Sequence, residues 1–426
     1  LHCGTTYRML YFPQKGGIRL ERTIFHIDAN NAFLSWTAVS RLQQGEELDI
    51  RTVPAIIGGD SQTRHGIVLA KSTPAKKYGI VTGEPTVSAF RKCPSLLSFP
   101  PDYSVYRQNS DAMFAILSRF SDRIEPFSID EGFLEYTGME YLFGPPLEAA
   151  EKIKQTIWEE LGFTVNIGIS SNKFLAKMAG ELEKPNKVIT LFPKEIPQKM
   201  WSLPVGDLFM VGKRTVPHLQ SMGIYTIGQL AAYPLDLLEK ELKSYGKMLH
   251  AYANGLDDTP LNPMRRSESP KTIGNSVTLT TDITDRESVQ KVLLSLAERV
   301  SARLREQAFF AAEIAVSIRS SDFHTYSHQI QLSQGINCTN AVYEAALQCF
   351  DLCWKKEPVR LLGIRAGKLS DHAFQQLSLL EKSWDKESKA DAALDQIRKK
   401  YGKNSVQRTS FLNAKPLPMK EEKTSK

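Results

Sequence analysis

Apolar and polar positions alternate with two periods along the first 191 residues of the chain. Short β-branched or apolar runs predict strands, and apolar positions spaced by three or four residues predict helices. Strands are predicted at the start of 23–33 and at 53–57, 66–70 and 164–169, and helices at 32–44, 104–120, 147–161 and 174–182. Strands that alternate with helices favour an α/β catalytic core.

The rest of the chain follows other patterns. Residues 203–233 are punctuated by glycines, which predicts short helices, and the Pro-, Asp- and Arg-rich residues 257–270 predict a linker. From 273 to 368 the elements follow the split β-α-β-β-α-β order, which leaves one sheet face free to bind a ligand. The final segment, 371–426, is charged and ends in a composition typical of disorder.

Composition narrows the class of protein. With 42% hydrophobic and 24% charged residues, the chain is expected to form an ordinary soluble core, and no apolar run approaches the roughly 20 residues of a membrane span. A net charge of +7 favours an anionic partner. None of the five cysteines has CxxC spacing, so we expect no zinc site and a reducing cytoplasm. Residues 1–21 are interpreted as an N-terminal extension.

Three carboxylates are the candidate chemistry. Asp28 ends the first predicted strand, and Asp130 and Glu131 lie side by side between apolar runs in 124–137. Our hypothesis is that these stretches meet and bind two Mg²⁺ ions, with the backbone carbonyl of Ala29 as a further ligand. Two such ions can activate a 3′-hydroxyl and stabilise a leaving pyrophosphate. An ordinary acidic turn is the alternative, and spacing alone favours it.

The motifs HIDANNAF and PFSIDEGFLEYT resemble the two catalytic motifs of the Y-family, DinB/UmuC-type translesion DNA polymerases. The resemblance covers roughly residues 22–380 and assigns the catalytic and metal-binding roles to Asp28, Asp130 and Glu131. It implies low-fidelity, template-directed transfer from a dNTP to a primer 3′ end, by a monomer in the bacterial cytoplasm that is associated with the nucleoid. A metal-dependent nuclease and a catalytically silent DNA- or clamp-binding homologue remain the alternatives.

The resemblance also implies a nucleotide site. Phe33 takes the position that excludes the ribose 2′-hydroxyl; an aromatic residue of the helix core is the alternative, which the residue pattern alone would favour. The backbone amides of Asn31, Ala32 and Phe33 can meet a phosphate at the helix start. In VLAKSTPAKKYGI, Thr73 and Lys76 stand where the family usually has a Tyr and an Arg. A lysine is a point charge, whereas an arginine offers a bidentate fork, so phosphate binding is expected to differ from the family pattern.

A helix of the family's second palm motif carries two lysines. Lys184 is expected to reach the triphosphate, and Lys177 lies seven residues earlier on the same helical face. A solvated lysine face is the alternative for Lys177.

Further motifs suggest contacts with DNA and with a sliding clamp. The stretch FMVGKRT resembles a helix-hairpin-helix that holds a DNA phosphate, although Met210 replaces a usual glycine; a plain interhelical turn is the alternative. QLSLL resembles the bacterial clamp-binding peptide, and the alternative is a short amphipathic segment without a binding role. The candidates for DNA in the hairpin are Gly212, Lys213, Arg214 and Thr215. Those on the DNA-facing strands are Arg319, His328, Arg360 and Arg365, for which solvated surface charge is the alternative. The candidates for the clamp are Gln376, Leu377, Leu379 and Leu380.

The resemblance implies the architecture of a right-hand polymerase. The expected parts are an α+β palm at 22–31 and 102–191, fingers at 32–101, and a helix-hairpin-helix thumb at 192–258. A linker at 259–270, a little finger at 271–370 and a tail with the clamp peptide at 371–426 complete the chain.

Overall fold

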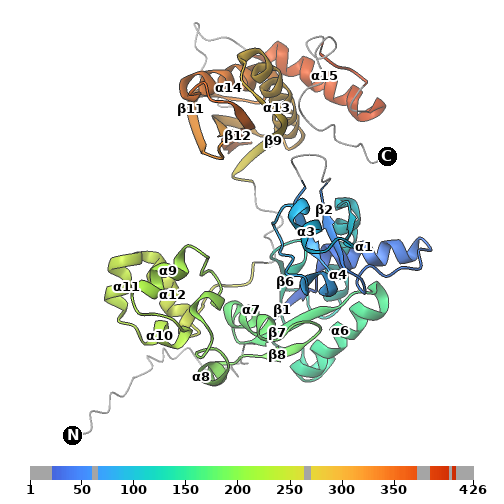
Figure 1. The fold of residues 1–426 in the computed structure, drawn as a ribbon, viewed down its shortest axis with the longest axis vertical. Helices are drawn as coiled ribbons and strands as arrows, with labels where there is room; N and C mark the ends of the chain where they lie inside the picture. The colour runs from blue at the N-terminus through green and yellow to red at the C-terminus, as the bar shows by residue number, and fades with distance from the viewer. Residues whose placement is uncertain (1–21, 60–65, 263–269, 372–383, 403–404, 409–426) are drawn as a thin grey trace. The chain divides into compact units, whose positions relative to one another are not determined.

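The computed structural model describes residues 22–59, 66–262, 270–371, 384–402 and 405–408. Contacts divide the chain into two compact units, one formed by 1–58 and 68–267 and the other by 59–67 and 268–426. Figure 1 shows the elements of each unit.

The central sheet of the first unit has the strand order β5-β6-β1-β7-β8. Strand β1 (Ile24–Ala29) lies in the middle and is antiparallel to both β6 (Glu131–Glu135) and β7 (Val165–Ser170). The outer strands are β5 (Ile124–Pro126) and β8 (Val188–Thr190), and β8 runs parallel to β7. This mixed sheet confirms the α+β core, although β8 was not predicted.

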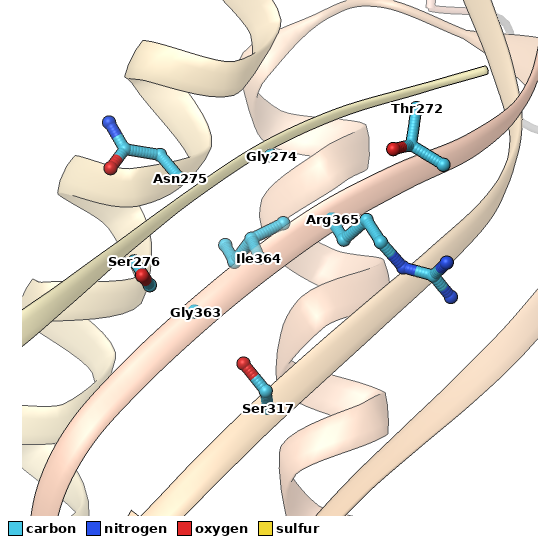
Figure 2. A pocket seen from close by; sticks show the side chains of 8 residues that line it. All are labelled: Thr272, Gly274, Asn275, Ser276, Ser317, Gly363, Ile364 and Arg365. Carbon is cyan, nitrogen blue, oxygen red and sulfur yellow. The ribbon is translucent and has the colours of Figure 1, made fainter. Parts of the chain in front are cut away.

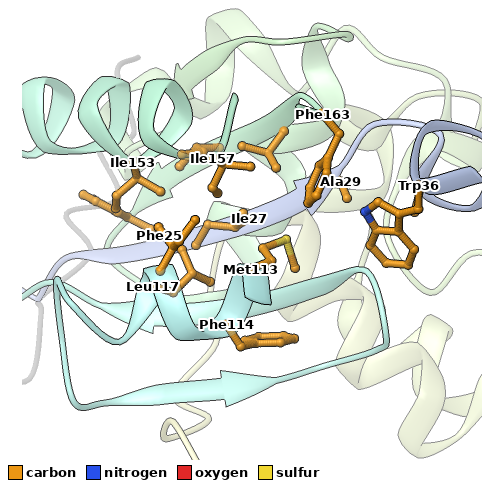
Figure 3. Close-up of a cluster of buried hydrophobic side chains, with 14 of the residues drawn as sticks. Phe25, Ile27, Ala29, Trp36, Met113, Phe114, Leu117, Ile153, Ile157 and Phe163 are labelled. Atoms are coloured by element: carbon orange, nitrogen blue, oxygen red, sulfur yellow. The ribbon is translucent and has the colours of Figure 1, made fainter. Parts of the chain in front are cut away.

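One face of this sheet covers the main hydrophobic core. Because side chains alternate along a strand, Phe25, Ile27 and Ala29 all face the same side and are fully or almost fully buried. Helices α1 (Ala32–Gln43), α4 (Tyr103–Leu117) and α6 (Pro146–Leu161) contribute to this core, where Figure 3 shows Met113, Leu117, Ile153 and Ile157 beside β1. These three helices were predicted from the spacing of their apolar residues, and the structure confirms them. The short α5 (Glu140–Phe143) was not predicted.

Helix α7 (Lys173–Leu182) packs closely against the same sheet through two glycines. A Cβ atom on Gly168 of β7 would overlap the backbone of both Ala176 and Gly180 in α7. Only glycine therefore allows the helix to lie this close to the strand. The close approach brings Lys177 of α7 to Glu131, which lies opposite Asp28 in the sheet. The prediction that Lys184 shares this helix is wrong, because α7 ends at Leu182 and Lys184 lies two residues beyond it.

A smaller sheet of order β3-β2-β4 follows α1 in the chain. Its strands β2 (Ala55–Gly58) and β3 (Val68–Lys71) match the predicted ones, and α2 (Thr73–Lys76) lies in the predicted basic stretch. Helix α3 (Thr86–Lys92) and strand β4 (Leu97–Phe99) were not predicted. They complete a small core with Ile56, Val68, Ala75, Ile80 and Ala89.

Short helices follow the central sheet, as the glycine pattern predicts. Figure 1 labels α8 (Ile196–Lys199), α9 (Thr215–Ser221), α10 (Ile227–Ala232), α11 (Leu235–Leu242) and α12 (Ser244–Ala253). Single turns of 3₁₀ helix, η1 (Pro193–Glu195) and η2 (Val205–Asp207), precede α8 and α9. Their apolar side chains share a core with Phe174, Leu175 and Met178 of α7.

The second unit confirms the split β-α-β-β-α-β order. Its sheet has the order β11-β10-β12-β9, with all neighbouring strands antiparallel. The elements are β9 (Thr272–Ile283), α13 (Arg286–Glu306), β10 (Phe310–Ser320), β11 (Thr325–Ile336), α14 (Thr339–Cys353) and β12 (Val359–Ser370). Both helices pack on the face that carries Ile314, Val316 and Ile318.

The charged final segment contains a helix that was not predicted, α15 (Asp385–Tyr401). Arg305 of α13 bonds Asp395 at 2.7 Å and Asp391 at 3.2 Å, and Asp391 accepts the backbone N–H of Thr339 at 2.6 Å. The apolar pattern did not reveal this helix because it has few apolar residues. It is held instead by shielded ion pairs and by capping of α14, neither of which composition reveals.

Candidate active site

Backbone pairing brings the three predicted carboxylates to one end of the central sheet. Asp28 of β1 lies opposite Glu131 of β6 in the antiparallel register, and the backbone N–H of Ala29 donates to the carbonyl of Asp130 at 2.9 Å. Directly opposed residues project from the same sheet face with Cβ atoms about 5 Å apart. Pairing of β1 with β6 thus brings Asp130 and Glu131 next to Asp28, although about a hundred residues separate them in the chain.

Each carboxylate already has a hydrogen-bond donor. Lys184 Nζ lies 2.5 Å from Asp28 Oδ2, Ser128 Oγ lies 2.5 Å from Asp130 Oδ1, and Lys177 Nζ forms an ion pair with Glu131 Oε2.

The same contacts set the charge state of two of the acids. Burial raises the pKa of Asp28 and outweighs the opposing effect of Lys184. Burial also acts to raise the pKa of Glu131, but hydrogen bonds from His26 and Lys177 prevail and lower it to about 2. Glu131 is therefore ionised at neutral pH.

The donor set suits a hard divalent cation. All three side chains offer carboxylate oxygens, which Mg²⁺ prefers, and each donor named above bonds to one oxygen of its carboxylate. In the part of the chain that the structure describes, no three His, Cys, Asp or Glu side chains form a ready-made metal cluster.

The start of α1 lies directly after Asp28. Asn31 precedes the helix with φ 48° and ψ 48°, and its side chain makes no capping bond. The first amides of the helix, at Ala32 and Phe33, have no intrahelical acceptor.

Asn30 contributes to the site in a way that the sequence did not indicate. Its side chain is almost fully buried and bonds Asn166 at 3.1 Å, Thr164 at 2.9 Å and the backbone N–H of Asn186 at 2.9 Å. Asn166 in turn donates to the carbonyls of Gly180 and Glu183. This network fixes both ends of the segment that carries Lys184.

The predicted sugar-contacting residue is held by ring stacking. The ring of Phe33 lies 4.4 Å from that of Tyr106 with an interplanar angle of 5°, and Trp36 packs nearby. The Tyr106 hydroxyl lies 3.2 Å from Thr37 Oγ1. Because Tyr106 is fully buried, it gives the half-buried Phe33 a rigid support.

Thr73 and Lys76 are exposed on α2. The short helix itself is anchored by Ser72, which is fully buried, accepts from Ala75 and donates to the carbonyl of Val53 at 2.7 Å. The structure thus shows two polar groups on a fixed turn and does not bring them to the carboxylates.

The alternative of a solvated face for Lys177 is wrong. Lys177 is 9% exposed, and its ammonium lies 5.3 Å from the ring of Phe127 and 5.2 Å from that of Phe209 while it pairs with Glu131. Helical spacing placed it with Lys184 but could not show that aromatic rings from two distant segments cover it.

His26 is the second functional neighbour that sequence reasoning missed. It is fully buried, and its Nε2 lies 2.9 Å from Glu131 Oε2. Burial lowers its pKa and outweighs the opposing effect of Glu131, so the imidazole is neutral and donates from Nε2. The sequence signal that could have identified His26 was a polar residue between the apolar residues Phe25 and Ile27 of β1.

The glycine-containing hairpin has the expected exposed side chains. Gly212, Lys213 and Arg214 are exposed, and Thr215 begins α9. Met210 adopts φ 79°, a conformation that favours glycine, and its carbonyl accepts the Tyr245 hydroxyl at 2.7 Å. The backbone therefore keeps the glycine-like turn despite the methionine.

In the second unit, strand register separates the four predicted DNA contacts. Arg319 and Arg365 lie on the sheet face opposite the helices, where Figure 2 shows Arg365 beside a shallow pocket lined also by Thr272, Ser276 and Ser317. His328 pairs with Val316, which places it on the helix-covered face, and Arg360 bonds Asp282. The prediction that His328 faces the open side is wrong.

The predicted clamp-binding residues, 376–380, lie outside the described residues. Among the helices that the structure does describe, none is long and apolar enough to cross a membrane.

Comparisons with known proteins match most of the chain. A family model described as impB/mucB/samB family matches residues 27–181, and one described as its C-terminal domain matches 270–379. DNA polymerase IV of Clostridium acetobutylicum is 47% identical over 92% of this chain and 99% of the relative. DNA polymerase IV 1 of Bacillus subtilis is 36% identical over 92% of this chain and 94% of its own. Among solved structures, the Y-family DNA polymerase chimera Dbh-Dpo4(243-245)-Dbh is similar in fold, with a TM-score of 0.69, 23% identity and coverage of 82% of this chain and 99% of that chain.

Proposed function

The chain belongs to the impB/mucB/samB family of Y-family, DinB-type DNA polymerases, and from this premise we propose that Asp28, Asp130 and Glu131 form its catalytic metal site. It is a template-directed DNA polymerase that carries out translesion synthesis by metal-dependent nucleotidyl transfer. The observation that carries the proposed site is the pairing of Asp28 with Glu131 across β1 and β6, next to Asp130.

Two Mg²⁺ ions are the proposed cofactors. The three carboxylates would hold them, with the backbone carbonyl of Ala29 as a further ligand, and no other residue type is needed because Mg²⁺ takes its remaining ligands from phosphate and water. When bound, the ions would activate the primer 3′-hydroxyl and stabilise the charge on the leaving pyrophosphate.

Lys184 is proposed to exchange its hydrogen-bond partner when nucleotide binds. Lys184, which bonds Asp28 and Glu181 here, would turn to the triphosphate once cations neutralise Asp28. Thr73 and Lys76 would add a hydroxyl and a charge from the fingers, and the amides of Asn31, Ala32 and Phe33 would meet phosphate oxygens. Phe33, supported by Tyr106, would contact the sugar.

The parts of the fold are assigned accordingly. We propose that the central sheet is the palm (22–31 and 102–191), the β3-β2-β4 sheet with its helices the fingers (32–101), and α9 to α12 the core of the thumb (192–258). The second unit would be the little finger (271–370), joined by the linker (259–270).

DNA would be bound through its backbone. Gly212, Lys213, Arg214 and Thr215 can meet a phosphate from an exposed turn, and Arg319 and Arg365 can do so from the open sheet face. Such contacts position DNA without reading its sequence, which suits an enzyme that must accept damaged templates. The protein is proposed to act as a monomer on chromosomal DNA in the bacterial cytoplasm.

Primer extension with four dNTPs and Mg²⁺, over damaged and undamaged templates, tests this function. We expect nucleotide addition opposite at least some lesions, with low fidelity on undamaged DNA. Shortening of the primer without extension would support the nuclease alternative, and DNA binding without either reaction would support the silent homologue.

The clamp-binding peptide is proposed at Gln376, Leu377, Leu379 and Leu380. The double substitution Gln376→Ala and Leu379→Ala is expected to reduce clamp-stimulated synthesis by about 10-fold or more, because tethering raises the effective concentration at the primer end. Basal synthesis without clamp should not change. Stimulation equal to that of the unmodified protein, measured on a clamp-loaded primed template, would remove these residues from the docking site.

A further inference from the structure

A histidine lies in the middle of β1, on the same sheet face as Asp28. His26 has no exposed surface, and its Nε2 lies 2.9 Å from Oε2 of Glu131. The proposed transfer reaction gives this imidazole no task of its own, because it is too enclosed to meet DNA or nucleotide.

The ring is enclosed on both sides. Phe133, its partner across the β1–β6 pair, packs against it with ring centroids 4.9 Å apart. On the other side, a Cβ atom added to Gly180 of α7 would lie 3.4 Å from His26 Nδ1. The close packing of α7 on β7 at Gly168 and Gly180 thus places α7 against the imidazole of His26. This packing holds the orientation of the ring.

This position has a cost for folding. Nδ1 of His26 is buried, and it has no hydrogen-bond partner within the described ranges of the chain. An unpaired buried polar atom destabilises the folded state, and an apolar side chain of similar size would avoid the loss. A buried polar atom without a partner calls for an explanation, and the contact of the other ring nitrogen with Glu131 points to one in function.

The hydrogen bond is directed to one oxygen of the carboxylate. His26 and Lys177 both contact Oε2 of Glu131, and no described residue donates to Oε1. Fixing one carboxylate oxygen from a rigid donor also fixes the direction of the other, because the group is planar. Lys177 alone would not achieve this, since a flexible ammonium can follow the carboxylate as it rotates.

We propose that His26 is a positioning residue that holds Oε2 of Glu131 and thereby presents Oε1 to a divalent cation. The inference rests on the proposed function, in which Glu131 is a metal ligand. It adds a residue outside the acidic trio that determines how well the trio binds its cation.

Mn²⁺ binding by non-reacting complexes tests the proposal. The full chain would be bound to a primer-template with a dideoxy-terminated primer and the next dNTP, so that no transfer occurs. Free Mn²⁺ would be followed by electron paramagnetic resonance, with the nucleotide-only titration subtracted, and thermal unfolding would be recorded for each protein. The variants are His26→Leu, His26→Gln, Glu131→Ala and, as a matched control for a buried β1 residue without contact to Glu131, Ile24→Val.

We expect His26→Leu to weaken Mn²⁺ binding by about 10-fold or more without lowering the unfolding temperature. His26→Gln should recover most of the affinity, because its amide can still donate to Oε2. Ile24→Val should lower the unfolding temperature slightly and leave Mn²⁺ binding unchanged.

Three results would overturn the proposal. If Glu131→Ala loses Mn²⁺ but His26→Leu binds it normally, the inference fails while the proposed function stands. If His26→Gln binds as weakly as His26→Leu, the donor is not what matters and the inference fails again. If Glu131→Ala binds Mn²⁺ normally, the metal-ligand role of Glu131 fails, and the role of His26 fails with it.

Discussion

Asp130→Ala is expected to reduce primer extension on the order of 10⁴-fold, which corresponds to about 5.5 kcal/mol of lost transition-state stabilisation. In the proposed site Asp130 provides carboxylate oxygens where negative charge must be neutralised during transfer. The fold should persist, because Asp130 lies just before β6 and its side chain bonds only to nearby Ser128 among the contacts described. Its backbone carbonyl, which pairs with Ala29, is retained by alanine.

Single-nucleotide incorporation with saturating DNA and Mg²⁺ measures this effect. The matched control is Asp122→Ala, since Asp122 is an exposed aspartate in the same segment of chain, before β5. It should extend primers like the unmodified protein. DNA affinity and unfolding temperature should be similar for both variants. Full activity of Asp130→Ala would show that the metal site has been assigned to the wrong residues.

Phe33→Ala is expected to increase ribonucleotide incorporation relative to deoxyribonucleotide by about 100-fold, or about 2.7 kcal/mol in differential transition-state binding. The ring can exclude a 2′-hydroxyl only if it cannot move aside. Stacking on Tyr106 at 4.4 Å provides that rigidity, because Tyr106 is itself fully buried. Alanine removes the ring while leaving the helix intact.

The ratio of kcat/KM values for matched ribo- and deoxyribonucleotides is the measurement. Tyr106→Phe is the control, because it keeps the stacked ring and removes only the hydroxyl that contacts Thr37. Sugar discrimination should change little in this control. If Phe33→Ala discriminates as well as the unmodified protein, another side chain tests the sugar.

Patterns within the chain predicted the local elements better than their assembly. Hydrophobic patterns predicted β1, α1, α4, α6 and α7, because each of these elements buries apolar side chains. Those of β1, α1, α4 and α6 lie in the main core, and those of α7 lie in the core of the short helices. It missed β4 and β8, three-residue strands that form only through pairing with β2 and β7. A strand this short has no period of its own to detect.

The site shows the same division. The acidic residues could be identified from their motifs, but the facing of Asp28 and Glu131 is a matter of register, which depends on pairing across a hundred residues. The burial of Lys177 depends on Phe127 and Phe209, which come from elsewhere in the chain. His328 was placed on the wrong face for the same reason, because strand parity in the second unit becomes certain only with the partner strand.

The central position of β1 affects how the protein is made. It is the first strand of the sheet to leave the ribosome, yet its partners β6 and β7 begin at Glu131 and Val165. At synthesis rates of roughly 5–20 residues per second, β1 waits roughly 5–20 s for its first partner. During that time both edges of an apolar strand are unpaired, and the charge of Asp28 and the polar ring of His26 interrupt the run, as gatekeeper residues do. The residues proposed to assemble the catalytic site would then also protect the nascent chain from aggregation before that site exists.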